Sequence, residues 1–479
     1  MAKPAAPAVA SDVLGQPFDL NIERVLEHWP VANAVREFIA NALDEHHLTG
    51  TPEPAISKSA DGSWFIEDYG RGVRYEHLTQ KENPEKLKHP EVIGQFGIGL
   101  KDALAVCDRR GISVVMRSSH GDITLARLPK AGFPDIVTLH GLVAEPSDAD
   151  RLGTRVELMG VKDEEIERAK ACFLVYSDDQ LLEQTKYGDV LGKTSPKIAG
   201  RIYVKGLLVA EEPNFLFSYN ITKLSAALRR ALNRERTNVG RGAYSDRIKE
   251  MLKECRTSEV VGPLAEDLSR FVSGKMHDEL AWKDVALHAC RVLQTNDRVV
   301  FITPWQTGNA AVEYAKADGY RPVIVPEDIA RALGGLTDLE GRPMFDLGAY
   351  QKHWNDSFDF TFVEPVDFTD DERRVYGLID DAAKLAAIKL AKCGVTEVKV
   401  SETMRLGETG SQVLGVFEPH EQRIVIRRDQ LATAKDFCGT FLHELAHAAS
   451  GHTDGTLDFE NALTGLLGAV ASTSLERSS

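Results

Sequence analysis

The 479-residue chain has little cysteine, no long apolar run and no excess of basic residues. Its six cysteines are scattered without a close pair, which argues against a disulfide framework or a cysteine-based zinc site and predicts reduced thiols in a cytoplasmic protein. No segment is apolar enough, over the length needed, to cross a bilayer, so we expect no membrane partner. Residues 1–17, rich in Ala and Pro, are expected to form a disordered leader rather than a secretory signal.

The chain is acidic, with a net charge of −15 at pH 7 from 57 Lys and Arg against 72 Asp and Glu. Duplex binding depends on Lys and Arg that neutralise phosphates, so this balance does not indicate a nucleic-acid partner. The hydrophobic fraction of 43% is ordinary for a globular protein, so most of the chain can bury a core. At roughly 150 residues per domain, the length predicts about three domains.

Helical and strand-like periodicities alternate along the chain and predict an α+β protein of several domains. In the C-terminal part we expect a long helix over 371–394, then strands, then a helix over 434–451. The β-α-β-α pattern near 297–335 carries no phosphate loop, which favours a spacer. The expected segments are an α/β sandwich over 18–160, a second α/β domain over 161–275, a small α/β spacer over 276–369 and an α+β domain over 370–479.

Three polar side chains recur on one face of the first predicted helix, where an amphipathic helix would place core residues. Glu37, Asn41 and Asp44 stand at i, i+4 and i+7. The amide oxygen of Asn41 suits a Mg²⁺ ion bound to phosphates, and Glu37 could polarise an attacking water. A solvated helix face would explain the same spacing if it stood alone.

The segment Asp68-Tyr-Gly70-Arg-Gly72 follows an apolar strand. A carboxylate at a strand end can accept a hydrogen bond from an exocyclic amine, and glycines let the backbone approach a flat base. Such a turn, taken alone, is usually only a turn.

A glycine-rich stretch, Gly94-Gln-Phe-Gly97-Ile-Gly99-Leu-Lys101, opens the next predicted helix. Backbone amides at a helix N-terminus can hold phosphates, and Lys101 adds a positive charge. The order of the glycines is neither that of the Walker loop nor that of the Rossmann loop.

In this order the residues resemble the GHKL ATPase superfamily, which includes the gyrase B subunit, MutL, the ninety-kilodalton heat-shock chaperones, histidine kinases and MORC proteins. EFIANALD matches the Glu-x-x-x-Asn-x-x-Asp box of the family, and DYGRG matches its Asp-x-Gly-x-Gly box. IGQFGIGLK looks like the chaperone form of its phosphate loop. Gly153-Thr154 matches the position of the threonine in its adenine network.

The resemblance implies a Bergerat-type sandwich that binds ATP and Mg²⁺, with hydrolysis assisted by Glu37, a residue that histidine kinases lack. It also implies that residues 73–92 form a mobile lid. An S5-like domain over 161–275 would send a basic residue to the γ-phosphate, for which we favour Arg236 over Arg234 and Arg241. The implied nucleotide-binding residues are Asn41 (the magnesium ligand), Asp44, Asp68, Gly70, Gly72, Gly94, Gly97, Gly99, Lys101 and Thr154.

A second motif, His443-Glu444-Leu-Ala-His447, falls in a predicted helix that ends at Gly451. Histidines at i and i+4 share a helix face, so both can reach one Zn²⁺ ion, and Glu444 is placed to act as a general base toward water. Two buried histidines satisfied by hydrogen bonds would be an alternative explanation. The preceding strand, QRIVIRR over 422–428, could supply the edge along which a peptide pairs.

This motif resembles that of the zincin metallopeptidases over residues 370–479. Such a site needs a third ligand, and the spacing is not that of the metzincins. Glu460 opens the next predicted helix, as the glutamate of the gluzincins does, although that gap is normally longer. We rank Glu460 first, Asp454 second and His452 third, and Asp458 also lies within reach.

The two sites together predict an ATP-regulated zinc-dependent peptidase with a protein substrate. Such a fusion suggests a bacterial stress or phage-defence effector. The alternative is a chaperone-like or MORC-like clamp that forms a homodimer on ATP and binds protein or DNA, with a zincin fold that serves only as structure.

Overall fold

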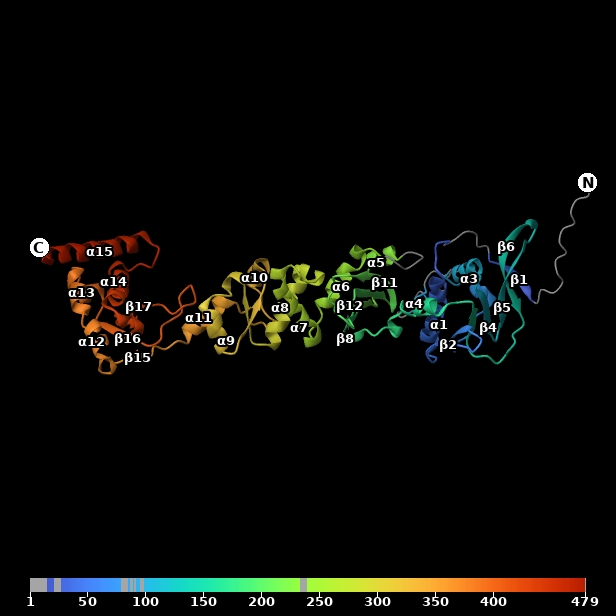
Figure 1. The fold of residues 1–479 in the computed structure, drawn as a ribbon, viewed down its shortest axis with the longest axis horizontal. Helices are drawn as coiled ribbons and strands as arrows, with labels where there is room; N and C mark the ends of the chain where they lie inside the picture. Colours follow the sequence, from blue (N-terminus) through green and yellow to red (C-terminus); the bar gives the residue numbers. More distant parts are fainter. Residues whose placement is uncertain are drawn as a thin grey trace, which may run out of the picture. The chain divides into compact units, whose positions relative to one another are not determined.

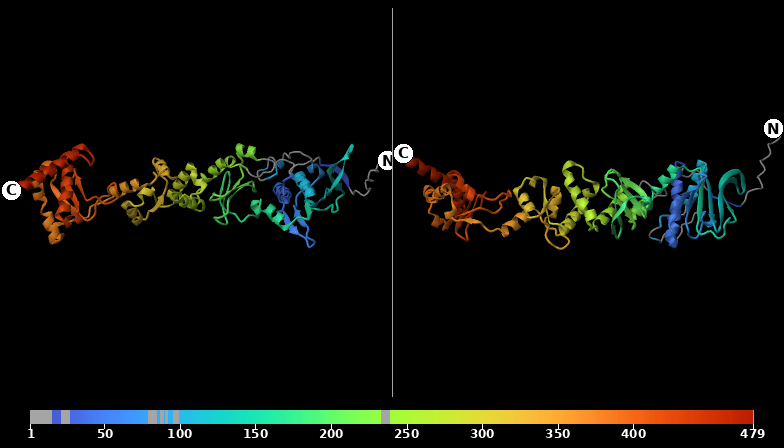
Figure 2. Two further views of the ribbon diagram at one scale, coloured as in Figure 1. Left: turned by 45° about the horizontal axis from the view of Figure 1, so that its top comes forward. Right: turned by 60° about the horizontal axis from the view of Figure 1, so that its bottom comes forward.

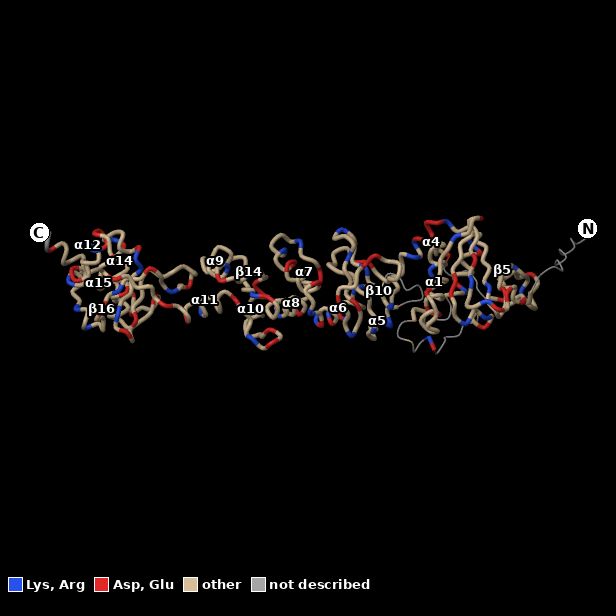
Figure 3. Tube along the Cα trace, turned by 90° about the horizontal axis from the view of Figure 1, so that it is seen from below, with Lys and Arg blue, Asp and Glu red and all other residues tan. Residues whose placement is uncertain are grey.

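The computed structural model describes residues 15–20, 27–78, 85–86, 89, 92–94, 99–232 and 239–478. The chain divides into two compact units, the first made of residues 1–267 and 275–289 and the second of residues 268–274 and 290–479. Both contain helices and sheets, which confirms the expected mixture of α and β structure (Figure 1). Acidic and basic residues are interspersed through both units (Figure 3).

The first unit begins with a seven-stranded sheet of order β1-β6-β5-β4-β7-β3-β2, in which every pair is antiparallel. Its apolar face packs against α1 (Val31–Thr49) and α3 (Gly99–Arg110), which form a second layer (Figures 1 and 2). Ile39 and Leu104 are fully buried between the layers, which stabilises the fold by about 1.5–3 kcal/mol for each side chain. The strands are β1 (Gln16–Asp19), β2 (Ala55–Lys58), β3 (Trp64–Glu67), β4 (Ser113–Ser118), β5 (Gly121–Lys130), β6 (Phe133–Ala144) and β7 (Arg155–Met159).

Helix α1 carries the first motif and has well-defined ends. It begins directly after Pro30, whose fixed φ and missing N–H suit the start of a helix. The free N–H of Ala32 donates to the Glu165 carboxylate at 2.8 Å, from α4 (Asp163–Lys170). At the other end Gly50 adopts a left-handed φ of 65°, which closes the helix. The sequence predicts that this helix begins at Ile22, and residues 22–26 lie outside the described part.

A five-stranded sheet of order β11-β10-β12-β9-β8 follows in the first unit. Its strands are antiparallel except for the parallel pair β10–β12. The helices that follow are α5 (Ala226–Ala231), α6 (Ser245–Leu252) and α7 (Ser258–Leu268), and the boundary of the units falls within α8 (Lys283–Asn296). The strands are β8 (Gln180–Thr185), β9 (Gly188–Gly192), β10 (Gly200–Val204), β11 (Leu207–Glu212) and β12 (Ser218–Ile221).

The second unit begins with a small α/β region. Strands β13 (Val299–Ile302) and β14 (Arg321–Ile324) are parallel and are connected through α9 (Ala310–Ala317). Helices α10 (Glu327–Leu333) and α11 (Leu347–Asp356) follow.

A four-stranded sheet of order β15-β16-β18-β17 follows, with its helices packed against one face (Figure 1). Core residues of this sheet, Ile424 and Ile426, contact Phe437 and Phe441 of α14 within one cluster. The elements are β15 (Phe362–Val363), α12 (Asp370–Tyr376), α13 (Ile379–Leu385), β16 (Glu397–Ser401), β17 (Gly415–Glu418), β18 (Arg423–Arg427), α14 (Ala434–Ser450) and α15 (Leu457–Ser478).

Two expectations for this region are wrong. The single helix over 371–394 is broken into α12, α13 and a short 3-10 turn, with Gly377 after the first helix and Ala387 at a positive φ of 56° after the second. A non-glycine residue in that conformation cannot continue a right-handed helix. The strand QRIVIRR, which is β18, is paired on both sides, so it is not a free edge, and β17 occupies the outer position instead.

The hairpin over 404–413 joins the two regions of the second unit. Leu406 is 5% exposed and lies in the same apolar cluster as Val300 and Ile302 of β13. Its backbone N–H and C=O both bond to the Asn355 side chain, at 2.8 and 2.9 Å. The hairpin therefore anchors the chain directly before it enters β17.

None of the helices in the described ranges combines the length and the apolar character needed to cross a membrane. The six cysteines are unpaired, as expected from their spacing.

Candidate nucleotide and metal sites

The three polar residues of α1 lie together at the edge of the sandwich and are not a solvated face. Glu37 is 3% exposed, and its Oε1 accepts a hydrogen bond at 2.9 Å from Arg36, which is itself 1% exposed. The other carboxylate oxygen of Glu37 lies against Gly99, where a Cβ atom would collide with it. Glycine at position 99 therefore lets the start of α3 approach this carboxylate.

Asp44 is fully buried and ties the glycine-rich stretch to α1. Its two oxygens accept from the backbone N–H groups of Ile93 at 2.6 Å and Gly94 at 2.9 Å. The ammonium of Lys86 lies 3.0 Å from Asp44 Oδ2 and 3.4 Å from the amide oxygen of Asn41. A cationic group thus stands between Asp44 and Asn41, the residue that the resemblance implies as the magnesium ligand.

The Asp68 carboxylate lies in a tight turn between β3 and β7. Its Oδ1 accepts from the N–H groups of Gly70 at 3.0 Å and Thr154 at 3.2 Å, and the Thr154 side chain also hydrogen-bonds to the carboxylate. Gly153, at φ 74°, lies so close to the Asp68 carbonyl that a Cβ atom could not fit. Burial raises the pKa of Asp68 to about 6, although the two N–H groups act in the opposite direction.

Thr154 and Gly72 complete this turn. The Thr154 hydroxyl accepts from Val73 N–H at 2.9 Å, and Gly72 has a φ of 83° that favours glycine. Thr154, which is far from the 68–72 segment in sequence, is therefore brought into direct contact with it through Asp68 and Val73.

Lys101 lies in the first turn of α3 and is 5% exposed, with no ion pair to a described residue. Burial lowers its pKa, while the carboxylates of Asp19 and Asp102 act to raise it. A buried lysine without a close counter-ion is costly, so an anion would be favoured beside it. Gly97 lies outside the described residues, as do 79–84, 87–88 and 90–91 of the expected lid.

Arg236, the favoured basic residue of the second domain, also lies outside the described residues, as does Arg234. Arg241 is engaged elsewhere, since it pairs with Asp278 at 2.7 Å and lies over the ring of Phe215.

Among the described basic residues of the second domain, Lys205 is the one whose side chain reaches the first domain. It lies at the turn between β10 and β11. Its ammonium donates to the carbonyl groups of His89 at 3.1 Å and Val92 at 3.4 Å. Burial lowers its pKa, and the charge of Asp44 acts to raise it, so the two side chains interact electrostatically. Lys205 has a positive φ of 50°, and no sequence motif marks it.

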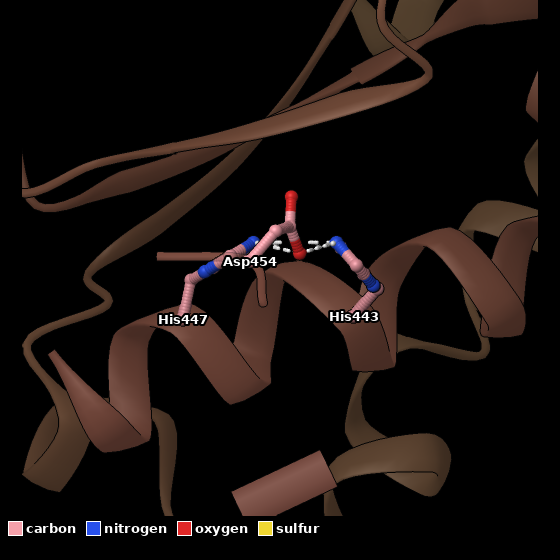
Figure 4. Close-up of side chains that lie close together, drawn as sticks. All are labelled: His443, His447 and Asp454. Carbon is pink, nitrogen blue, oxygen red and sulfur yellow. Dashed lines mark hydrogen bonds and ion pairs between the residues drawn. The ribbon is translucent and has the colours of Figure 1, made fainter. Parts of the chain in front are cut away.

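The two histidines of the second motif, on α14, form a compact group with Asp454, which follows that helix (Figure 4). The Nε2 atoms of His443 and His447 are 3.2 Å apart, and Asp454 Oδ1 lies 3.2 and 3.4 Å from them. Ligands at about 2.0–2.1 Å in a tetrahedron around zinc are about 3.3 Å from one another. The three atoms therefore fit a tetrahedral metal ion with a fourth position open.

The structure brings Asp454, and not the first-ranked candidate Glu460, next to the two histidines. Glu460 lies in the first turn of α15, and its carboxylate is not part of the group that the two histidines and Asp454 form. Gly451, at φ 69°, ends α14 and turns the chain so that Asp454 returns over the helix. His452 accepts at its carbonyl oxygen from His447 Nδ1 at 2.8 Å, which orients that histidine, while its own Nε2 lies 3.3 Å from Asp458 and is not part of the group.

Glu444 is 6% exposed and points toward β17. A Cβ atom at Gly415 would lie 2.8 Å from the Glu444 side chain, so glycine lets the strand approach the helix here. Burial raises the pKa of the Glu444 carboxyl to about 7; the N–H of Phe417 acts to lower it, and Asp454 acts to raise it. The carboxylate is thus held between the helix and the outer strand of the sheet.

Comparison with known proteins gives a family for the chain. Residues 164–258 match the model of the family described as the Mycoplasma pneumoniae MPN635 N-terminal domain, and this range includes Lys205. An uncharacterised protein of Mycoplasma pneumoniae is 38% identical over 240 residues, which cover 49% of this chain and 96% of the relative. A second uncharacterised protein of that organism is 30% identical over 337 residues, 66% of this chain and 94% of the relative. The chain belongs to the family of these Mycoplasma pneumoniae proteins.

Proposed function

We propose that this protein is an ATP-binding GHKL-type protein whose nucleotide site controls a zinc-dependent peptidase in the C-terminal domain. The observation that carries the peptidase half is the mutual spacing of His443, His447 and Asp454, which suits a tetrahedral ion with one open position. Glu444, the second residue of the same motif, lies on the same helix beside them.

The nucleotide half is supported by the convergence of the motifs on one region of the first domain. Asp68 has a buried carboxylate, held by the N–H groups of Gly70 and Thr154, which can accept from the exocyclic amine of adenine. Asn41 and Asp44 offer oxygens for Mg²⁺, and Lys101 is a buried cation near the glycine-rich stretch. The order of these groups along the chain is that of the GHKL ATPases.

At the second site the chain would act on an extended peptide. Strand β17 pairs with β18 on one side and with no described strand on the other. A peptide added along that open edge would pass beside Glu444. A zinc ion held by the two histidines and Asp454 would polarise the peptide carbonyl as a Lewis acid. Glu444 would accept a proton from the attacking water and deliver it to the leaving amine.

ATP bound in the first domain would act on the peptidase through the second domain. Lys205 already bonds to the carbonyl groups of His89 and Val92, which flank the glycine-rich stretch, and it interacts with Asp44. Nucleotide phosphates placed there would compete for the same ammonium group. We therefore assign to Lys205 the role that the GHKL resemblance implies for Arg236.

Purified protein is expected to contain about one zinc per chain, since three protein ligands hold zinc tightly in structural and catalytic sites. His443→Ala combined with His447→Ala should reduce the metal content to background in elemental analysis. His353→Ala, which removes an exposed histidine of α11, is the control and should leave the content unchanged. Wild-type protein without stoichiometric zinc would contradict the peptidase half.

ATP binding is expected to weaken as the pH falls through about 6. The ionised Asp68 carboxylate is the form that accepts from the adenine amine, and burial raises its pKa to about 6. Below that value the free protein must first release a proton, so affinity should fall by up to about tenfold per pH unit. Calorimetric titration with a non-hydrolysable ATP analogue from pH 8 to pH 5 measures this, with a folding check at each pH. Affinity independent of pH would contradict the assignment.

Lys86→Met is expected to lower the Mg²⁺ concentration needed for nucleotide binding. The Lys86 ammonium lies between Asp44 Oδ2 and Asn41 Oδ1, so a magnesium ion at Asn41 must displace it. Removing a competing, partly buried ion pair should shift the half-maximal Mg²⁺ concentration by roughly tenfold. Fluorescent-nucleotide binding titrated with Mg²⁺ reports this. The control is Glu85→Gln, which changes a carboxylate that pairs with Arg71. An unchanged Mg²⁺ requirement in Lys86→Met would contradict the proposed displacement of the Lys86 ammonium by magnesium.

A further inference from the structure

The small α/β region at the start of the second unit contains a cavity that neither the nucleotide site nor the metal site uses. It has a volume of about 280 Å³ and is lined by the end of β13, by α10 and by Met344 and Asp346 in the second unit. Thr303 directly follows β13, and Glu327 opens the helix after β14, so the cavity opens at the carboxyl ends of the two parallel strands. That is where open α/β sheets bind their ligands.

The chain path around β13 makes this end of the sheet suitable for a ligand. From β13 the chain passes through α9 to β14 on one edge, and after α10 it returns so that Asp346 forms a parallel bridge with Phe301 on the other edge. Connections that diverge in this way leave a crevice at the strand ends. Phe301 and Asp346 both line the cavity.

The wall of the cavity carries charges of both signs that are not paired with each other. Glu327 and Arg331 stand one turn apart on α10, at a spacing that allows an ion pair, yet neither forms one with a described residue. Asp346 accepts from Ala349 N–H through Oδ1, and no described residue pairs with its other oxygen. Two carboxylates and one guanidinium are therefore available to a ligand.

The rest of the lining is apolar. Phe301, Leu333 and Met344 are buried side chains that form part of the wall. The excess of carboxylates disfavours a phosphate ligand, because two like charges would repel it and only Arg331 would attract it. A cavity of this size, at the lower end of small-molecule sites, suits a compact ligand.

We propose that this cavity binds a small zwitterion with an apolar side chain, of the class of the neutral α-amino acids. The ligand carboxylate would pair with Arg331, its ammonium with Asp346 and Glu327, and its side chain would contact Phe301, Leu333 and Met344. The region over 276–369 is then a ligand-binding domain and not a spacer. The proposal is independent of the ATP and zinc assignments.

The test uses the full-length protein and matched probes. L-Leucine, L-methionine and L-phenylalanine are titrated by calorimetry up to about 10 mM, beside 3-methylbutylamine and 4-methylpentanoate, which each lack one charge of leucine. Inorganic phosphate is the anionic probe. We expect saturable one-to-one binding of at least one amino acid, and at least about tenfold weaker binding of the amine and the acid alone.

Substitutions in the cavity wall test whether the amino acids bind in this cavity. Arg331→Gln and Asp346→Asn should each weaken amino-acid binding by at least about tenfold, and Asn keeps the acceptor that caps α11. Asp328→Asn, which changes an exposed residue of α10 outside the cavity lining, should leave it unchanged, with melting temperatures checked for all three. Absence of binding by all three amino acids, binding of phosphate in their place, or equal binding in Arg331→Gln would overturn the proposal.

Discussion

Glu444→Gln is expected to abolish peptide cleavage while the protein keeps its zinc and its ability to bind ATP. Glutamine has nearly the same shape and can still accept from Phe417 N–H, so the packing of α14 against β17 is preserved. It cannot accept a proton from water, and loss of a general base costs about 10²–10⁴-fold in rate. Cleavage of a denatured protein substrate, followed by mass spectrometry of the products, measures the effect.

The matched control for this variant is Glu460→Gln. Glu460 is an exposed carboxylate near the same histidines but outside the ligand group, so its loss should leave both zinc content and cleavage unchanged. Asp454→Asn should instead lower the zinc content, because it weakens the third ligand. If Glu460→Gln lost zinc and Asp454→Asn did not, the ligand set derived from the structure would be wrong.

Asp68→Asn is expected to weaken ATP binding by about 100-fold without affecting zinc. The asparagine oxygen can keep the bonds from Gly70 and Thr154, which places its NH₂ group where the second carboxylate oxygen now lies. That group would face the exocyclic amine of adenine, donor against donor, so a charge-assisted bond is replaced by repulsion.

Equilibrium binding of a non-hydrolysable ATP analogue measures the loss, with Asp150→Asn, an exposed aspartate of the same domain, as the control. A guanine nucleotide provides a second comparison, because its carbonyl oxygen in place of the amine could accept from the new NH₂ group. Unchanged ATP affinity in Asp68→Asn would show that the first site is wrongly assigned.

The groups that share one helix could be predicted well from the sequence. Helical spacing fixes which side chains lie together, so Glu37, Asn41 and Asp44 on α1 meet in one region, as do His443 and His447 on α14. The spacing does not say whether the first group is a solvated face. Burial of Glu37 and Asp44 decides that point.

Residues that come from loops and turns could not be predicted in this way. Asp454 reaches the histidines because Gly451 reverses the chain, a geometry that ranking by family spacing did not capture when it favoured Glu460. Lys86 and Lys205 approach Asp44 and its neighbours from separate segments, and no local pattern marks them. Long-range placement of this kind depends on tertiary packing.

The order of the strands in a sheet was the other feature that could not be predicted from the sequence. A strand can be predicted from alternation, but whether it lies at an edge depends on which strands pair with it. The sequence order suggested β18 as the edge before the metal helix, whereas β17 takes that place because, among the described strands, it pairs with β18 alone. The substrate edge in the proposed mechanism moves accordingly to residues 415–418.

ATP bound in the first domain is proposed to control proteolysis in the last domain, and the cleavage products formed in cells report on that control. New protein N-termini are compared by proteomics in cells expressing the wild type, Glu444→Gln or Asp68→Asn at equal levels. We expect a set of cleavage sites that is absent in cells expressing Glu444→Gln and whose abundance changes in cells expressing Asp68→Asn. Identical N-termini in wild-type and Glu444→Gln cells would contradict the peptidase, and wild-type cleavage in Asp68→Asn cells would contradict its control by ATP.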